Sequence, residues 1–181
     1  MKTGNRSRTV LAVVGVSMAL TSCGQAERDY AVPEKVCGAA VEESALAPLL
    51  PPGEKLKESE RESSGFGTTH HYCSLIVDRS EVVSIDVRTS DRTLAPEDWT
   101  TAVASYPHSA EADLGISGAR AVVGSHRALV SAQCQGRSPY LTFDIWEFGD
   151  TVEASEKGAK ILQTFTKEYV LGVKKKLECT V

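Results

Sequence analysis

One cluster of side chains in this sequence could bind a metal ion: the pair His70-His71, followed closely by Cys73. Imidazole and thiolate groups are ligands that suit zinc or copper. Adjacent residues of a strand point to opposite faces, however, so the two histidines cannot easily hold one ion together. We therefore predict no metal site and no cofactor, and we interpret the segment as a transition from a loop into a strand.

Acid–base chemistry would need paired carboxylates, and Asp86 and Asp144 could form such a pair if their strands are neighbours. Both residues lie on the expected solvent-facing side of a strand, where acidic side chains commonly serve solubility. His108 and His126 stand alone in the sequence and are expected at surface or turn positions. We predict no catalytic residue. Convergence of Asp86, Asp144 and a histidine in one pocket would instead favour a hydrolase of the cell envelope.

Motifs for nucleophilic catalysis and phosphate binding are absent from the sequence. Gly115-Ile116-Ser117-Gly118 has the wrong spacing for a nucleophile elbow, and no S-x-x-K occurs. Gly65-Phe66-Gly67 lacks the lysine and the helix that follow a phosphate-binding loop. The formal charge of −4 over 181 residues argues against a nucleic-acid partner, because such partners select basic surfaces. We therefore expect a non-catalytic protein.

The N-terminus has the pattern of an export signal. Three basic residues, Lys2, Arg6 and Arg8, precede an apolar run over 10–20, and small residues follow it. The run is shorter than the roughly 20 residues that a membrane span requires. A basic start, a short apolar stretch and small residues after it are typical of a secretory signal.

The end of this run, Leu20-Thr21-Ser22-Cys23, resembles the lipobox of bacterial lipoprotein precursors. The resemblance implies transfer of a diacylglyceryl group to the Cys23 thiol and cleavage before Cys23. Acyl chains anchor a protein because each buried methylene contributes about 0.8 kcal/mol. The predicted location is the cell membrane, with the protein held by its lipid on the extracytoplasmic side.

Three segments follow from this interpretation: a signal peptide over 1–22, a lipidated cysteine with a flexible tether over 23–34, and a single domain over 35–181. Cleavage would remove three basic residues and no acidic one, so the formal charge would change from −4 to −7. One domain is the expected number for a chain of this length.

Four cysteines remain beyond the lipobox, and an even number in an exported chain predicts two disulfides. Three connectivities are possible. No two of these cysteines have the CxxC spacing of a zinc knuckle or a redox site. The four residues are Cys37, Cys73, Cys134 and Cys179.

The first half of the domain is expected to form a helix, two strands and a second helix. The helices are predicted from 33 to a stop at 48, and from 96 to 107, each beginning at a proline. The charged segment 55–67 reads as an exposed connection that could contain a short edge strand. Strands are predicted over 72–78 and 81–89. Residues expected to face the core are Cys73, Leu75, Val77, Val83, Ile85, Val87, Trp99 and Val103.

The second half is expected to form three strands and a long helix. Strands over 119–123 and 126–134 flank Gly124-Ser125, a pair suited to a type II′ turn. A third strand is predicted over 140–148 and a helix over 155–177, with lysines opposite its apolar stripe. Lysines 174–176 fall in its last turns, where the helix dipole favours cations. Residues expected to face the core are Leu141, Phe143, Ile145, Leu162, Phe165, Tyr169, Val173 and Leu177.

These elements predict an α+β fold of order α-β-β-α-β-β-β-α, with helices packed on one face of an antiparallel sheet of about five to six strands. Cys37 lies on the first expected helix and Cys179 just beyond the last one. Cys73 and Cys134 face the core from strands. We therefore prefer the disulfides Cys37–Cys73 and Cys134–Cys179, each of which would fasten a helix to a strand.

The cysteine pattern together with the lipobox is similar to that of small two-disulfide lipoproteins, mostly uncharacterised, of high-GC Gram-positive bacteria. That resemblance implies no functional residue.

Tyr140 and Trp146 share the outward side of one strand, and Phe148 continues it. Exposed aromatic residues beside polar ones often mark binding surfaces, unless a helix or loop covers them.

We therefore predict a membrane-tethered binding or interaction module with an unknown protein or cell-envelope partner. Its possible binding surface is Tyr140, Trp146 and Phe148. An alternative is a carrier for a small apolar ligand or lipid, which would need an internal apolar pocket of several hundred Å³.

Overall fold

The computed structural model describes residues 28–65, 67–93, 96–134 and 140–179. The predicted signal peptide, the lipobox and Cys23 lie outside these residues. In chain order the elements are β1 (Lys35–Val36), β2 (Ala39–Ala40), α1 (Glu43–Leu46), the 3-10 turn η1 (Ala47–Leu49), β3 (Leu56–Gly65), β4 (Thr68–Val77), β5 (Ser80–Ser90), α2 (Pro96–Ser105), β6 (Ala110–Ala112), β7 (Ala119–Val123), β8 (Arg127–Gln133), β9 (Tyr140–Glu147) and α3 (Glu156–Lys176).

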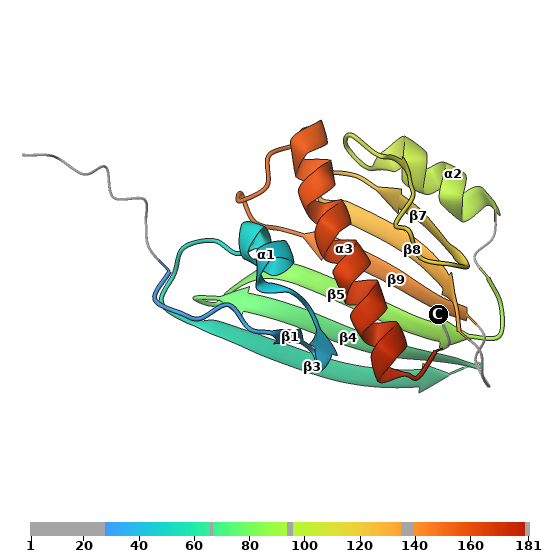
Figure 1. Ribbon diagram of the computed structural model, residues 1–181, viewed down its shortest axis with the longest axis horizontal. Coiled ribbons are helices and arrows are strands. Elements are labelled where there is room, and N and C mark those ends of the chain that lie inside the picture. The colour runs from blue at the N-terminus through green and yellow to red at the C-terminus, as the bar shows by residue number, and fades with distance from the viewer. Residues whose placement is uncertain (1–27, 66, 94–95, 135–139, 180–181) are drawn as a thin grey trace, which may run out of the picture.

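Within the described residues, seven strands form one antiparallel sheet in the order β3-β4-β5-β9-β8-β7-β6, and β1 pairs with β2 separately. The long helix α3 lies across this sheet (Figure 1). The α+β prediction is confirmed, but the predicted count of five to six strands was too low. The charged segment 56–65 forms the full-length edge strand β3, paired with β4 over ten residues. Its charges suit an edge position because they oppose pairing with another chain.

The main core lies between α3 and one face of the sheet. Phe143 of β9 is fully buried there, and its ring meets that of Tyr169 edge-on at a centroid distance of 6.3 Å. The predicted helix stripe is buried from Leu162 to Val173, but Leu177 is exposed because α3 ends at Lys176. Lys174 lies in the last turn of α3, as predicted. This residue is buried, and its ammonium group donates to the carbonyl oxygen of Ser117 at 3.4 Å.

Helix α2 packs on the opposite face of the sheet, so the prediction of helices on one face only was wrong. Val122 and Leu129 form a second small core with α2, whereas their strand neighbours point into the main core. Successive side chains of a strand alternate between faces, which places α2 and α3 on opposite sides. The buried side of α2 carries Trp99 and Ala102 and continues at Tyr106, the residue after the helix, while Val103 is exposed.

The first predicted helix is mostly absent. Residues 35–40 form the β1–β2 hairpin, whose turn places Cys37 and Gly38 at φ values of 47° and 75°. Within the range predicted for this helix, helical structure is confined to α1 and η1. The predicted type II′ turn at Gly124-Ser125 is also wrong, because Gly124 does not have the positive φ that this turn needs. The Gly124 amide instead donates to the Arg127 carbonyl at 2.9 Å.

Both preferred disulfides are confirmed. Cys37–Cys73 joins the turn of the β1–β2 hairpin to β4, with the two Cα atoms 6.0 Å apart. Cys134–Cys179 joins the segment after β8 to the residues that follow α3, with a Cα separation of 4.8 Å. Each bond therefore fastens a terminal part of the domain to the large sheet.

The close approach of α3 to β2 predicts a marked effect of replacing Gly172. A Cβ atom at this position would lie 2.3 Å from the carbonyl oxygen of Ala40. We expect Gly172→Ala to lower the free energy of unfolding by about 1–3 kcal/mol, as overpacking does, despite alanine's preference for helices. Gly65 is a matched control, because nothing lies within 4 Å of its Cβ position. Denaturant unfolding showing equal stability for both variants would contradict this packing.

Candidate functional site

The face of the sheet opposite α3 carries a cluster of polar side chains. Cross-strand register places Tyr72, Asp86 and Asp144 in one row across β4, β5 and β9. His70 and Arg88 pair in the adjacent row. Residues directly opposite each other on neighbouring strands share a face and lie in contact. Among the described helices, α2 covers only the β7–β8 side of this face.

The two carboxylates singled out from the sequence are indeed neighbours, and each is engaged by a basic group. His70 Nδ1 lies 3.1 Å from Asp86 Oδ2. Arg127 donates from Nε and Nη2 to the two oxygens of Asp144 at 2.9 and 2.8 Å. The fold thus brings Asp86, Asp144 and a histidine together. They lie on a sheet face rather than as free groups around a cavity.

Arg127 is the central residue of this face. Its guanidinium carbon lies 3.7 Å from the ring centre of Trp146 and 4.5 Å from that of Tyr106. The two rings and the carboxylate together hold this guanidinium firmly, because cation–π contacts and paired hydrogen bonds reinforce each other. The sequence analysis missed Arg127. Its position two residues before Leu129, on the outward side of the same strand, was the available signal.

Trp146 and Phe148 form an exposed aromatic pair beside Arg127. Their rings are nearly parallel, with centroids 6.0 Å apart and an interplanar angle of 8°. Trp146 is 37% exposed and Phe148 52% exposed. The second small core under α2 therefore does not cover them. We call Arg127, Trp146 and Phe148 the aromatic patch.

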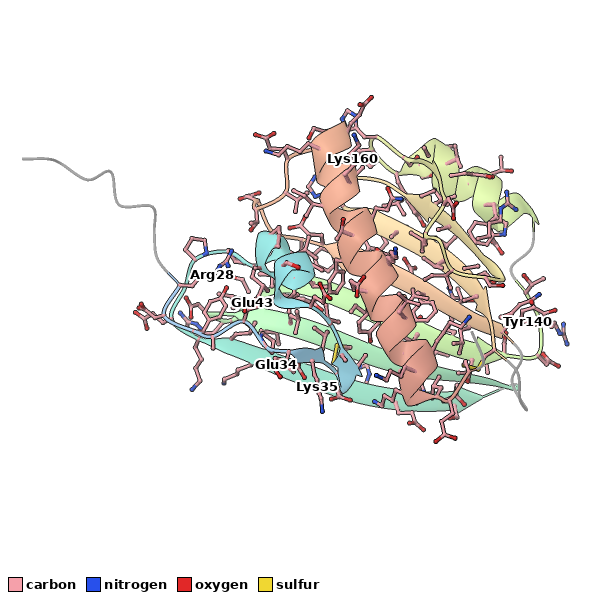
Figure 2. The ribbon with its side chains drawn as sticks, in the orientation of Figure 1. Arg28, Glu34, Lys35, Glu43, Tyr140 and Lys160 are labelled. Atoms are coloured by element: carbon pink, nitrogen blue, oxygen red, sulfur yellow. A yellow bond between two sulfur atoms is a disulfide. The ribbon has the colours of Figure 1, made fainter. Side chains whose placement is uncertain are left out.

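Tyr140 does not belong to the aromatic patch. It lies six residues before Trp146 on β9, a separation of about 20 Å along a strand. It lines a separate groove of about 360 Å³ with Trp99 and Arg120. Figure 2 shows Tyr140 at the end of the molecule opposite to Arg28. The surface expected from three aromatic residues is thus divided between two places.

The histidines of the expected metal-like cluster point apart. His70 contacts Asp86 on the outer face, whereas His71 Nδ1 lies 3.2 Å from Glu62 Oε2 on the face of the main core. Cys73 is held in its disulfide. The three residues therefore do not converge, because adjacent residues of a strand point to opposite faces of the sheet.

A second pair of a histidine and a carboxylate, His126 with Glu147, was not predicted from the sequence. His126 Nδ1 lies 2.6 Å from Glu147 Oε2, and the Glu147 side chain is fully buried. Burial raises the pKa of the Glu147 carboxyl, an effect that its bond to His126 partly offsets. The neighbouring Ser125 hydroxyl donates to the Pro107 carbonyl at 3.3 Å rather than to His126. Ser125 is therefore not placed as the nucleophile of a catalytic triad with this pair.

Comparisons of the chain with protein-family models, with curated proteins and with solved structures found no match. Among the described residues, no helix is both long enough and apolar enough to cross a membrane.

Proposed function

We propose that this protein is a lipid-anchored, extracytoplasmic binding module that contacts a partner in the cell envelope through the aromatic patch. The observation that carries the proposal is that Trp146 and Phe148 are exposed to solvent, while the contact with Arg127 holds Trp146 in place. Tryptophan and arginine are enriched among the few residues that dominate the energetics of protein contacts. The patch presents both residue types already positioned.

Contacts of the N-terminal segment support a short tether. The Arg28 guanidinium donates to the carbonyl oxygens of Ala47 and Leu50, each at 2.7 Å. The Asp29 amide donates to the Gly53 carbonyl at 2.8 Å, at the end of the sheet where β3 begins (Figure 1). If Cys23 carries the lipid, the five residue steps to Arg28 span at most about 18 Å. The domain would then lie close to the bilayer.

A photo-crosslinking experiment tests the contact surface. A photo-reactive phenylalanine analogue in place of Phe148 should capture one envelope partner on intact cells. The change Trp146→Ala should reduce that capture about tenfold or more, since losing a hot-spot side chain costs about 2 kcal/mol. Val103→Ala is the matched control, because Val103 is an exposed apolar residue of α2 outside the patch. Undiminished capture with Trp146→Ala would contradict the proposal, as would capture of lipid alone.

A cell-envelope hydrolase is the second candidate, and the convergence of Asp86, Asp144 and His70 favours it. Both carboxylates are already bonded to basic groups, which makes binding the better-supported function. The two functions differ in one measurable respect. A hydrolase would release soluble fragments from purified envelope material and lose this activity with Asp86→Asn. The binding module should release none, and Asp86→Asn should leave the capture through Phe148 in place.

A further inference from the structure

A cavity of about 240 Å³ lies on the face of the main core, between the C-terminal part of α3 and strands β3 to β5. Its walls include the buried residues Cys73, Val87, Tyr169 and Val173. Its rim carries exposed charged residues from β3 and from the end of α3. The cavity therefore combines an apolar interior with a polar mouth, the composition of a small-molecule site.

Acidic side chains border the cavity on the side of β3, where Glu60 and Glu62 line it. Glu58, Glu60 and Glu62 alternate along β3 and so share the face on which the cavity lies. Carboxylate oxygens of Glu58 and Glu60 lie within 4.8 Å of each other. Among the described residues, neither forms an ion pair, whereas Glu62 contacts His71. Burial raises the pKa of Glu58, the Cys37 amide lowers it, and the charge of Glu60 raises it further.

Tyr169 provides an independent sign of a ligand. Its side chain is only 2% exposed and lines the cavity, yet its hydroxyl has no hydrogen-bond partner in the described part of the chain. Burial, with the charges of Glu60 and Glu58, raises the pKa of this hydroxyl, which stays protonated. A tyrosine hydroxyl can donate one hydrogen bond and accept others, so this group is available to a ligand in the cavity.

Two basic residues, Arg61 and Lys176, also line the cavity, and each is held in a contact of its own. The Lys176 ammonium donates to the Cys37 carbonyl at 3.1 Å. The Arg61 guanidinium lies over the ring of Tyr72, 4.8 Å from its centre, on the opposite face of the sheet. Among the described residues, no basic side chain therefore forms an ion pair with Glu58 or Glu60. A metal ion could not use Cys37 as a thiolate ligand, because this residue is in a disulfide.

We propose that this cavity binds a small organic cation, a protonated amine attached to an apolar group. Its ammonium group would meet the carboxylate of Glu60 and the hydroxyl of Tyr169, and its apolar part would lie against Val87 and Val173. The cavity volume corresponds to roughly eight water molecules at about 30 Å³ each. The ligand therefore has about eight to ten non-hydrogen atoms. This site lies on the face opposite the aromatic patch and does not depend on the proposed contact surface.

Phenethylammonium is a probe of suitable size, and 2-phenylethanol and phenylacetate are its neutral and anionic counterparts. Titration of the full-length protein at low salt should show phenethylammonium binding at least about tenfold more tightly than the alcohol, because charge-assisted bonds are the stronger ones. Phenylacetate should not bind. Backbone amide NMR signals of Val87 and Val173 should shift with the amine. Equal binding of amine and alcohol, or shifts confined to other regions, would overturn the proposal.

Two substitutions test the polar contacts. Glu60→Gln should weaken phenethylammonium binding about fivefold to tenfold, and Tyr169→Phe about threefold to tenfold. Glu60 is exposed and Tyr169→Phe removes only one oxygen, so both variants should stay folded. Glu43→Gln is the charge-matched control, since this exposed residue lies on α1 (Figure 2), and it should bind like the wild type. Unchanged affinity in both test variants would overturn the site. Preferential binding of Ca²⁺ without shifts at Val87 would do the same.

Discussion

Replacing Cys23 by alanine should transfer the protein from the membrane fraction to the medium almost completely. Residue 23 is the acceptor that the lipobox resemblance implies, so the proposed lipid anchor depends on its thiol. Two acyl chains anchor stably because each buried methylene contributes about 0.8 kcal/mol. Fractionation of cells, with mass analysis of the N-terminal peptide, measures the change.

The change Ser22→Ala is the matched control for Cys23→Ala. It keeps a small residue before the cysteine, so lipidation and membrane association should persist. Membrane association of Cys23→Ala equal to that of the wild type would contradict the proposed anchor. An unmodified Cys23 in the wild-type protein would also contradict it, whatever the location of the protein.

Removing the disulfide Cys134–Cys179 should lower the free energy of unfolding by about 4 kcal/mol. The bond closes a loop with a sequence separation of 45 residues, and the chain-entropy relation gives about 4 kcal/mol for this length. Both cysteines should be changed to alanine together, so that no free thiol remains. Such a loss is a large part of a typical domain stability of about 5–15 kcal/mol. Denaturant unfolding at fixed pH measures it.

Two comparisons sharpen this prediction. Removing Cys37–Cys73, which closes a loop with a sequence separation of 36 residues, should have a nearly equal effect, because loop entropy varies slowly with length. Reducing agent should destabilise the wild type and leave the variant without both disulfides unchanged. A loss below about 1 kcal/mol in the Cys134→Ala, Cys179→Ala variant would show that the cross-link does not support the sheet in this way.

The molecule has two faces with different chemistry. The outer face of β4, β5 and β9 carries bonded charges and the aromatic patch, which suits contact with a large partner. The face toward α3 carries the main core, and a cavity lies there beside Glu60 of β3. A large partner and a small cation could therefore be bound at the same time, without competing for the same residues.

Strict alternation made several predictions from the sequence succeed. Val83, Ile85 and Val87 on β5 are buried as expected, and so are Leu141, Phe143 and Ile145 on β9. Cys73 lies on the buried side of β4 together with Leu75 and Val77. When residues alternate and one face of the sheet is exposed to solvent, the strand has only one favourable orientation, because a shift by one residue would expose the whole apolar set.

The predictions were wrong where the apolar spacing fits more than one local structure. Residues 33–48 have apolar spacing that fits a helix, but the disulfide at Cys37 and the left-handed backbone at Gly38 favour a hairpin. The stripe of α2 was assigned to Trp99 and Val103, although Ala102 and Tyr106 are the buried partners of Trp99. Short helices offer several possible stripes, and the packing surface decides among them.

The sequence by itself determined the apolar faces of the central strands and the buried stripe of α3, because side-chain period and burial are local properties of an element. It also predicted the disulfide pairing that the structure confirms. The tertiary structure alone decided that β3 joins the sheet, that α2 lies on the face opposite α3, and that Arg127 meets Trp146. These outcomes depend on which elements become neighbours, and contacts between distant segments leave little trace in the periodicity of either one.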